Sequence, residues 1–146
     1  MLRDPCLILL SRQHHNGLAL CVKTRRSLGA DGSPANVAKL AHKAIERYEA
    51  DLAIHFEIEE KVVFPHCGDL PVVRELIAEH RWTEELIAQL RARPTRDLLV
   101  QCYTLMVSHI RREEAGLFEH IQQILPAETL RRIGRDVARL AGPARF

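Results

Sequence analysis

The sequence has no hydrophobic run long enough to cross a membrane. Its longest uncharged stretch, residues 98–110, has thirteen residues and includes polar side chains, whereas a transmembrane helix needs about 20 apolar residues. The apolar run at residues 6–10 is too short for a signal peptide and lacks a small-residue cleavage site. We therefore expect a cytoplasmic protein with no membrane partner.

Paired cysteines and an excess of charge of one sign are also missing. The four cysteines are scattered along the chain with no Cys-x-x-Cys pair, so neither a disulfide framework nor a zinc knuckle is expected. The 21 Lys and Arg residues nearly balance the 19 Asp and Glu residues, which leaves a net charge of +2. This balance is too even to indicate a nucleic-acid partner.

Glycine and proline are not abundant, at seven residues each, whereas 47% of the chain is hydrophobic. This composition excludes a disordered tail and a fibrous repeat. The 146 residues suit one compact domain, residues 1–146. Alternation of period two is nearly absent, and apolar residues recur at steps of three and four, so the sequence predicts an all-α fold.

Capping signals divide the chain into five predicted helices. The first begins at Asp4-Pro5 and ends at Gly29, the second runs from Ser33-Pro34 to about His66, the third from Pro71 to near Arg93, the fourth from about Thr95 or Arg96 to Leu125, and the fifth from about Ala127 to Ala141, before Gly142-Pro143. Short loops make neighbouring helices alternate in direction. The prediction is an up-down-up-down four-helix bundle over about residues 5–125 with a short C-terminal fifth helix.

Histidine and glutamate occupy helix positions where leucine would be expected. The inward stripe of the second predicted helix has His55 and Glu59 at its centre, and that of the fourth has His109 and Glu113, again four residues apart. The two stripes are Ala41, Ile45, Tyr48, Leu52, His55, Glu59, Val62 and His66, and Leu98, Cys102, Leu105, His109, Glu113 and Gly116. Buried polar groups at such positions need partners.

The other two bundle helices each offer an inward histidine as well. His80 lies at the centre of the third stripe, and His14 continues the first stripe. Counting residues from the helix ends at about 1.5 Å per residue places these histidines near the level of the other two. Because His14 and His15 are neighbours, only one can point inward; we favour His14 and keep His15 as the alternative.

A His and a Glu four residues apart project from one face of a helix, so the imidazole can bind one metal ion and the carboxylate can reach a second. Two such helices predict a dinuclear site. Nitrogen and oxygen ligands without thiolate favour iron, with manganese and zinc as competitors. The Glu-x-x-His motif of ferritin-like carboxylate bundles is absent.

The ordered set of these motifs resembles the hemerythrin-like, or HHE cation-binding, family over roughly residues 5–125. The set is His14, His55-x-x-x-Glu59-Glu60, Glu79-His80 and His109-x-x-x-Glu113-Glu114. The resemblance implies a four-helix bundle that holds a non-haem di-iron centre. His14, His55, His80 and His109 would be terminal ligands, and Glu59 and Glu113 would bridge the two irons.

One position departs from this family. The invertebrate oxygen carriers of the family have a second histidine four residues after the one in the third helix, where this chain has Glu84. Glu84 is therefore a candidate additional ligand, an acceptor for a ligand or a surface acid. Fewer imidazoles leave an open coordination position, which argues against a simple reversible oxygen carrier.

The expected function is a di-iron protein that binds or reacts with a small oxidant, O₂, hydrogen peroxide or nitric oxide. Whether it is an enzyme is left open. The alternative is a non-catalytic iron or oxygen sensor, or an iron-storage module, that signals through metal occupancy. A structural zinc or manganese bundle is a third hypothesis. The terminal helix could cover the bundle or pair with another chain, so no oligomeric state is predicted.

Overall fold

The computed structural model describes residues 2–142, and within them all regular secondary structure is helical. The elements are α1 (Pro5–Ala30); α2 (Pro34–Arg47), η1 (Tyr48–Leu52), α3 (Ala53–Ile58), η2 (Glu59–Val63) and η3 (Phe64–Cys67); α4 (Pro71–Ala92); α5 (Arg96–Arg112), η4 (Glu113–Leu117) and α6 (Phe118–Ile124); and α7 (Ala127–Ala141). The predicted all-α class is confirmed. Pro143, part of the predicted end signal of the last helix, lies outside the described residues.

The helices begin where the capping signals predict. The side chain of Asp4 accepts a hydrogen bond from the backbone nitrogen of Cys6, and Ser33 and Thr95 cap α2 and α5 in the same way. Each cap satisfies a backbone N–H that has no partner within its helix. Pro5, Pro34 and Pro71 occupy the first turns of their helices, where the missing N–H costs nothing.

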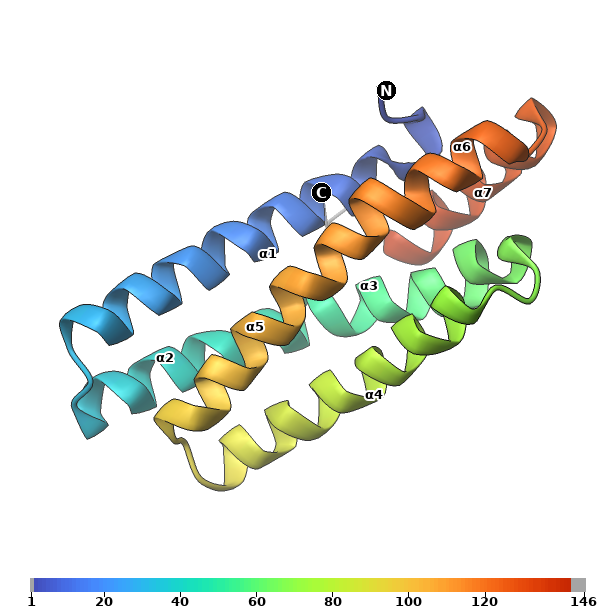
Figure 1. Ribbon diagram of the computed structural model, residues 1–146. Coiled ribbons are helices and arrows are strands. Elements are labelled where there is room, and N and C mark those ends of the chain that lie inside the picture. The colour runs from blue at the N-terminus through green and yellow to red at the C-terminus, as the bar shows by residue number, and fades with distance from the viewer. Residues whose placement is uncertain (1, 143–146) are drawn as a thin grey trace.

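The long helical segments lie side by side (Figure 1). The chain follows α1, returns along α2 and α3, follows α4 and returns along α5 and α6. Helix α5 contacts α1, α2 and α4, and α2 contacts α1 and α4. This arrangement is compatible with the predicted up-down-up-down bundle.

Helix α7 covers one end of the bundle rather than standing free. Its inward residues Leu130, Ile133 and Val137 are buried in the same hydrophobic cluster as Leu7 and Ile58 of the bundle. Four arginines of α7, Arg131, Arg132, Arg135 and Arg139, are exposed. The sequence left open whether this helix covers the bundle or pairs with another chain. In the structure it covers the bundle.

Three short π-helical turns interrupt the second and fourth segments: η1, η2 and η4. A π-turn holds more residues than an α-turn, so it advances the inward stripe by one position. This shift explains a wrong prediction, because Gly116 is exposed and Leu117 is buried in its place. His66, also assigned to an inward stripe, is only half-buried.

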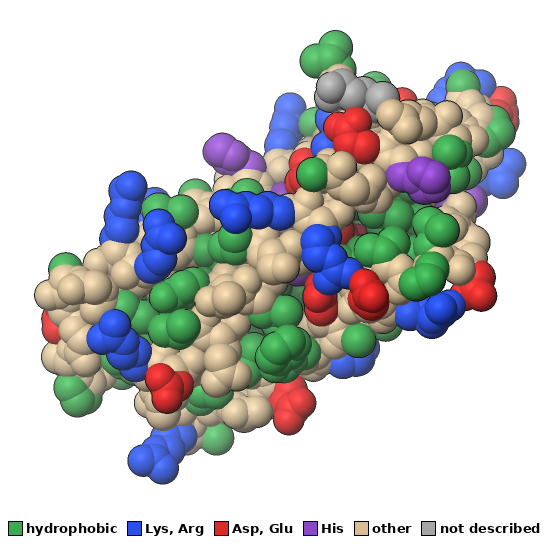
Figure 2. All heavy atoms as spheres, viewed as in Figure 1, with side chains coloured by type: hydrophobic (Ala, Val, Ile, Leu, Met, Phe, Trp, Pro, Cys, Tyr) green, Lys and Arg blue, Asp and Glu red, His purple; other side chains and the backbone are tan. Residues whose placement is uncertain are grey.

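The outer surface is mixed in character. On the face shown in Figure 2, basic and acidic side chains are both spread over the molecule between hydrophobic ones. Within residues 2–142, no helix has the length and apolar character that a membrane crossing requires.

Candidate metal centre

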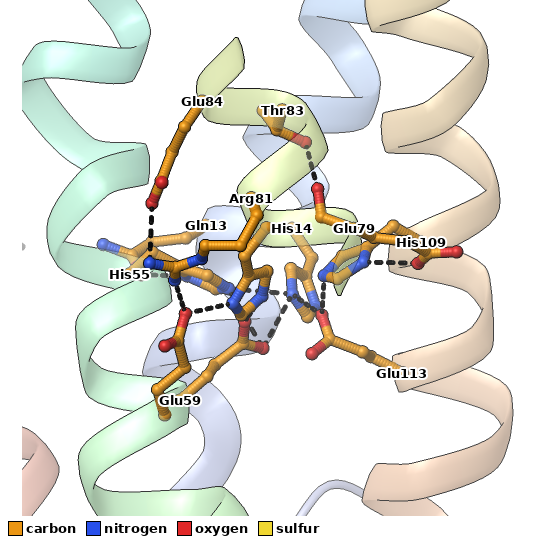
Figure 3. A network of polar contacts seen from close by, with 12 residues as sticks. Gln13, His14, His55, Glu59, Glu79, Arg81, Thr83, Glu84, His109 and Glu113 are labelled. Atoms are coloured by element: carbon orange, nitrogen blue, oxygen red, sulfur yellow. Dashed lines mark hydrogen bonds and ion pairs between the residues drawn. The ribbon is translucent and has the colours of Figure 1, made fainter. Parts of the chain in front are cut away.

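Six buried side chains from the four bundle segments meet at one level of the interior (Figure 3). They form two groups of four potential metal ligands. One group is His14, His55, Glu59 and Glu113, and the other is Glu59, His80, His109 and Glu113, with the donor atoms of each group within 4.8 Å of one another. The two groups share both glutamates. The structure thus brings together the six residues that the sequence predicted as ligands.

The Glu59 carboxylate lies between the two groups of histidines. Its Oε1 is 3.0 Å from Nε2 of His80, and its Oε2 is 3.3 Å from Nε2 of His55 and 3.7 Å from Nε2 of His14. Glu59 is 0% exposed. One carboxylate oxygen therefore faces each group, as a carboxylate shared by two cations requires.

Glu113 has the matching position on the opposite segment. Its Oε1 lies 3.1 Å from Nε2 of His14 and 3.2 Å from Nε2 of His109. It is also 0% exposed. The His-x-x-x-Glu spacing explains both placements, because residues four apart share one face of a helix, and Glu59 and Glu113 each begin a π-helical turn.

Several polar atoms of this cluster have no hydrogen-bond partner. Five side-chain nitrogen or oxygen atoms in the described residues are buried without one, and four of them belong here: Oε2 of Glu59, Nε2 of His109 and both carboxylate oxygens of Glu113. Leaving such atoms unpaired costs about 1–3 kcal/mol each, and more for charged groups. A set of unpaired nitrogen and oxygen atoms that converge on one point fits bound cations, which would satisfy them together.

Each histidine donates its Nδ1 hydrogen to a side chain from a neighbouring bundle segment. The pairs are His14 to Glu114 (2.8 Å), His55 to Gln13 (2.7 Å), His80 to Glu60 (2.7 Å) and His109 to Glu79 (2.8 Å). These bonds close a ring around the bundle, in which every segment supports a histidine of the next one. They also leave each Nε2 directed at the centre, which is the tautomer that metal binding needs.

Three arginines pair with the outer carboxylates of the cluster. Arg81 pairs with Glu60, Arg112 pairs with Glu79, and Arg3 lies 3.4 Å from Glu114. Burial raises the pKa of Glu114, but hydrogen bonds from His14 and Ser11 and the charge of Arg3 outweigh it, so the pKa is lowered. The outer carboxylate therefore stays ionised and acts as an acceptor for the His14 ring.

The imidazoles are packed between phenylalanine rings. Phe56 stacks on His80 with ring centroids 3.8 Å apart, and Phe64 stacks on the same histidine at 5.8 Å. Phe118 stacks on His14 at 5.5 Å. These contacts fix the ring orientations and keep water from the sides of the cluster.

Burial and the shared carboxylates act on the pKa values in opposite directions. Burial alone lowers the pKa of His109, but Glu113, Glu59 and Glu79 raise it to about 9. The pKa of His14 is also raised, because Glu113, Glu114 and Glu59 outweigh burial. Glu59 is affected the other way: burial raises its pKa, and the neighbouring histidines and Glu113 lower it well below its usual range. The cluster thus holds carboxylates and imidazolium ions in close contact.

The remaining predicted candidates lie outside both groups. His15 is exposed, so the neighbouring His14 is the inward histidine of α1. Glu84 has a side chain 37% exposed and lies 3.4 Å from Arg81, while Thr83 beside it is buried. Figure 3 shows Glu84 at the edge of the network, next to Arg81.

The supporting role of Gln13, Glu60, Glu79 and Glu114 was not predicted from the sequence. A signal for it exists, because each of them is the immediate neighbour in sequence of an inward residue: His14, Glu59, His80 or Glu113. A residue next to an inward position on a helix faces the adjoining helix, which is where these acceptors are needed.

Comparison with known proteins agrees with the resemblance carried by the motifs. The model of the hemerythrin HHE cation-binding domain matches residues 8–121 of the chain. No individual curated protein and no solved structure gives a significant match. The matched region includes all six clustered side chains and most of the chain, and the chain therefore belongs to the hemerythrin HHE cation-binding family.

Proposed function

We propose that the protein holds two iron ions in the His/Glu cluster and reacts with a small oxidant: O₂, hydrogen peroxide or nitric oxide. The observation that carries this proposal is the pair of four-residue groups that share both glutamates. Each ion would have two imidazoles and share Glu59 and Glu113 with the other ion. Donor sets of imidazole and carboxylate suit iron, with manganese and zinc as competitors.

In this function the protein would orient the four imidazoles and keep water away from their rings. The Nδ1 hydrogen bonds hold the four imidazoles in one tautomer, and such supporting bonds typically raise metal affinity about 10–100-fold. Phe56, Phe64 and Phe118 exclude water from the rings. A bound pair of ferrous ions would supply two electrons to an oxidant.

Elemental analysis of anaerobically purified protein is the direct test, followed by absorption spectra before and after exposure to air. Two irons per chain and new near-ultraviolet bands on oxidation would support the proposal, and turnover of hydrogen peroxide would then be assayed. His15→Ala is the matched control for His14→Ala, because the two histidines are neighbours and only His14 belongs to the cluster. One zinc or no metal, with helicity unchanged by a chelator, would refute the proposal.

A second candidate function is an iron or oxygen sensor, or an iron-storage module, that signals through metal occupancy. The unpaired buried atoms of Glu59, His109 and Glu113 favour it, because metal binding would change the stability of the fold. Loss of helicity on chelation without peroxide turnover would identify this function. Turnover of peroxide by the iron-loaded protein would identify the first.

A further inference from the structure

An elongated cavity of about 110 Å³, partly open to the surface, lies beside the His/Glu cluster between the bundle helices. Its lining extends from His14 to Thr24 along α1 and from His109 back to Leu99 along α5. Ten residues of helix correspond to about 15 Å. These residues place the cavity in the half of the bundle between the cluster and the loop that joins α1 to α2. Figure 1 shows this loop at one end of the bundle.

The walls of the cavity are mainly apolar. Leu52, Phe56, Ile87, Leu99, Met106 and Ile110 line it, together with the rings of Tyr48 and Tyr103 and the thiols of Cys21 and Cys102. Arg47 and Asp51, which also line the cavity, form an ion pair with each other. Gly17 leaves space on the α1 side, because a Cβ there would only touch Cδ1 of Ile110, at 3.4 Å.

The size of the cavity exceeds what a diatomic oxidant needs. One water molecule needs roughly 10–15 Å³ measured in this way, and an apolar cavity of about 150 Å³ binds benzene. A volume of about 110 Å³ therefore suits one aromatic ring or a short branched alkyl group. His55 and His109 line the same space, so such a group would lie directly against the cluster.

One polar group of the lining outside the His/Glu cluster has no partner. Gln13 accepts the Nδ1 hydrogen of His55 with its Oε1, while its own Nε2 is buried without an acceptor. A ligand that brings an oxygen acceptor would satisfy this donor. The lining contains no unpaired charge, which disfavours a carboxylate or an ammonium group.

We propose that the cavity is a binding site for a small uncharged organic molecule with an oxygen acceptor, the class to which alkyl and aryl hydroperoxides belong. The hydrocarbon group lies among Phe56, Met106 and Ile110, and the oxygen faces the end that holds Gln13, His55 and His109. Binding itself does not depend on the metal, while reaction of a hydroperoxide there rests on the proposed function.

Benzyl alcohol is a suitable probe, because it has one ring and one oxygen and is not an oxidant. Calorimetry on the purified protein should show saturable binding of one molecule per chain. Gly17→Leu fills the cavity and should weaken binding about tenfold or more, since even one methylene group in a pocket changes affinity about tenfold. Gly29→Leu is the matched control: it adds the same side chain to the same helix, at a position where a Cβ meets nothing within 4 Å.

Cys21→Leu fills the cavity from another position and serves if Gly17→Leu does not fold. Absence of saturable binding to the wild type, or equal weakening by Gly29→Leu, would overturn the proposal. In the iron-loaded protein, the cavity variants should lower kcat/KM for tert-butyl hydroperoxide more than for hydrogen peroxide, and an equal loss for both would also count against it. Binding of benzyl alcohol without turnover of either peroxide would support this site and refute the proposed function.

Discussion

Binding of metal by the metal-free protein should release about two protons per chain at pH 7. Two imidazoles of the cluster are protonated in the metal-free protein, because the pKa of His109 is raised to about 9 and that of His14 is also raised. A metal ion binds only the neutral imidazole, so both protons must leave.

The number of protons released follows from the pKa of His109. At pH 7, which is two units below its pKa of about 9, about 99% of His109 is protonated. With His14 protonated as well, two protons exchange for two metal ions. The combined affinity for the metal pair should then fall about 100-fold for each pH unit of acidification below 7. Because the two sites interact, this value describes the cluster and not either histidine alone.

Anaerobic calorimetry with ferrous ion, in two buffers of different ionisation enthalpy, measures the protons released. Manganous ion in the same experiment separates proton release from any oxidation of iron. About two protons are expected at pH 7, and fewer at pH 10, where His109 is already neutral in the metal-free protein. Uptake of two ions at pH 7 without proton release would show that His14 and His109 are not protonated in the metal-free protein, and the reasoning would be refuted.

Four further predictions concern single side chains. The pKa of His109 is about 9 when folded and about 6.5 when unfolded, so the metal-free fold should lose about 3 kcal/mol as pH rises from 6.5 to 9; urea unfolding measures this, and a flat profile would contradict it. His14→Ala should lower the metal content and His15→Ala should not, as elemental analysis of both variants would show. Glu79→Ala removes the acceptor of the His109 ring and should weaken metal binding about 10–100-fold in competition with a chelator; unchanged affinity would deny the acceptor this role. Burial raises the pKa of Cys21 to about 11, so iodoacetamide should modify it about 300-fold more slowly at pH 7.5 than a free thiol of pKa about 8.5; mass spectrometry against the urea-unfolded chain provides the rate, and equal rates would contradict the burial.

The features of the fold that could be predicted are those that depend on short stretches of sequence, such as the starts of the helices. Asp4 with Pro5 and Ser33 with Pro34 define helix starts, because a cap acts within about one turn. In the fourth segment, the inward positions Leu105, His109 and Glu113 also followed from spacing, since α5 is an uninterrupted α-helix up to Arg112. Past Glu113 the spacing failed, because η4 is a π-turn and shifts the buried position to Leu117.

The candidate site was predictable in its residue types and only partly in its contacts. Buried His and Glu side chains are costly, so a histidine in each of four inward stripes and a glutamate in two of them indicated a shared partner. The acceptors of the histidine rings were missed, because they depend on which residues face each other across two helices. Gln13, for example, meets His55 although the two lie 42 positions apart in the chain.

The cavity could not be predicted, because periodicity reports which residues are buried and not how well they fill space. The apolar residues Met106 and Ile87 line the cavity. Ile58, Leu117 and Phe118 pack in the hydrophobic cluster that α7 covers. The two halves of the bundle therefore differ: one is closed by α7, and the other keeps a cavity beside the metal layer.

The way the ligand groups are divided among the helices links metal binding to folding. One group takes residues from α1, α3, η2 and η4, and the other from η2, α4, α5 and η4, so neither is complete until three bundle segments are packed, and the pair needs all four. The ring of Nδ1 hydrogen bonds connects the same segments in a closed cycle, from α1 to α3, η2 to α4, α4 to α5 and η4 back to α1. A ligand that binds only the folded chain stabilises it by its own binding free energy. Because the same helices also form the cavity walls, metal occupancy and the shape of the cavity should change together.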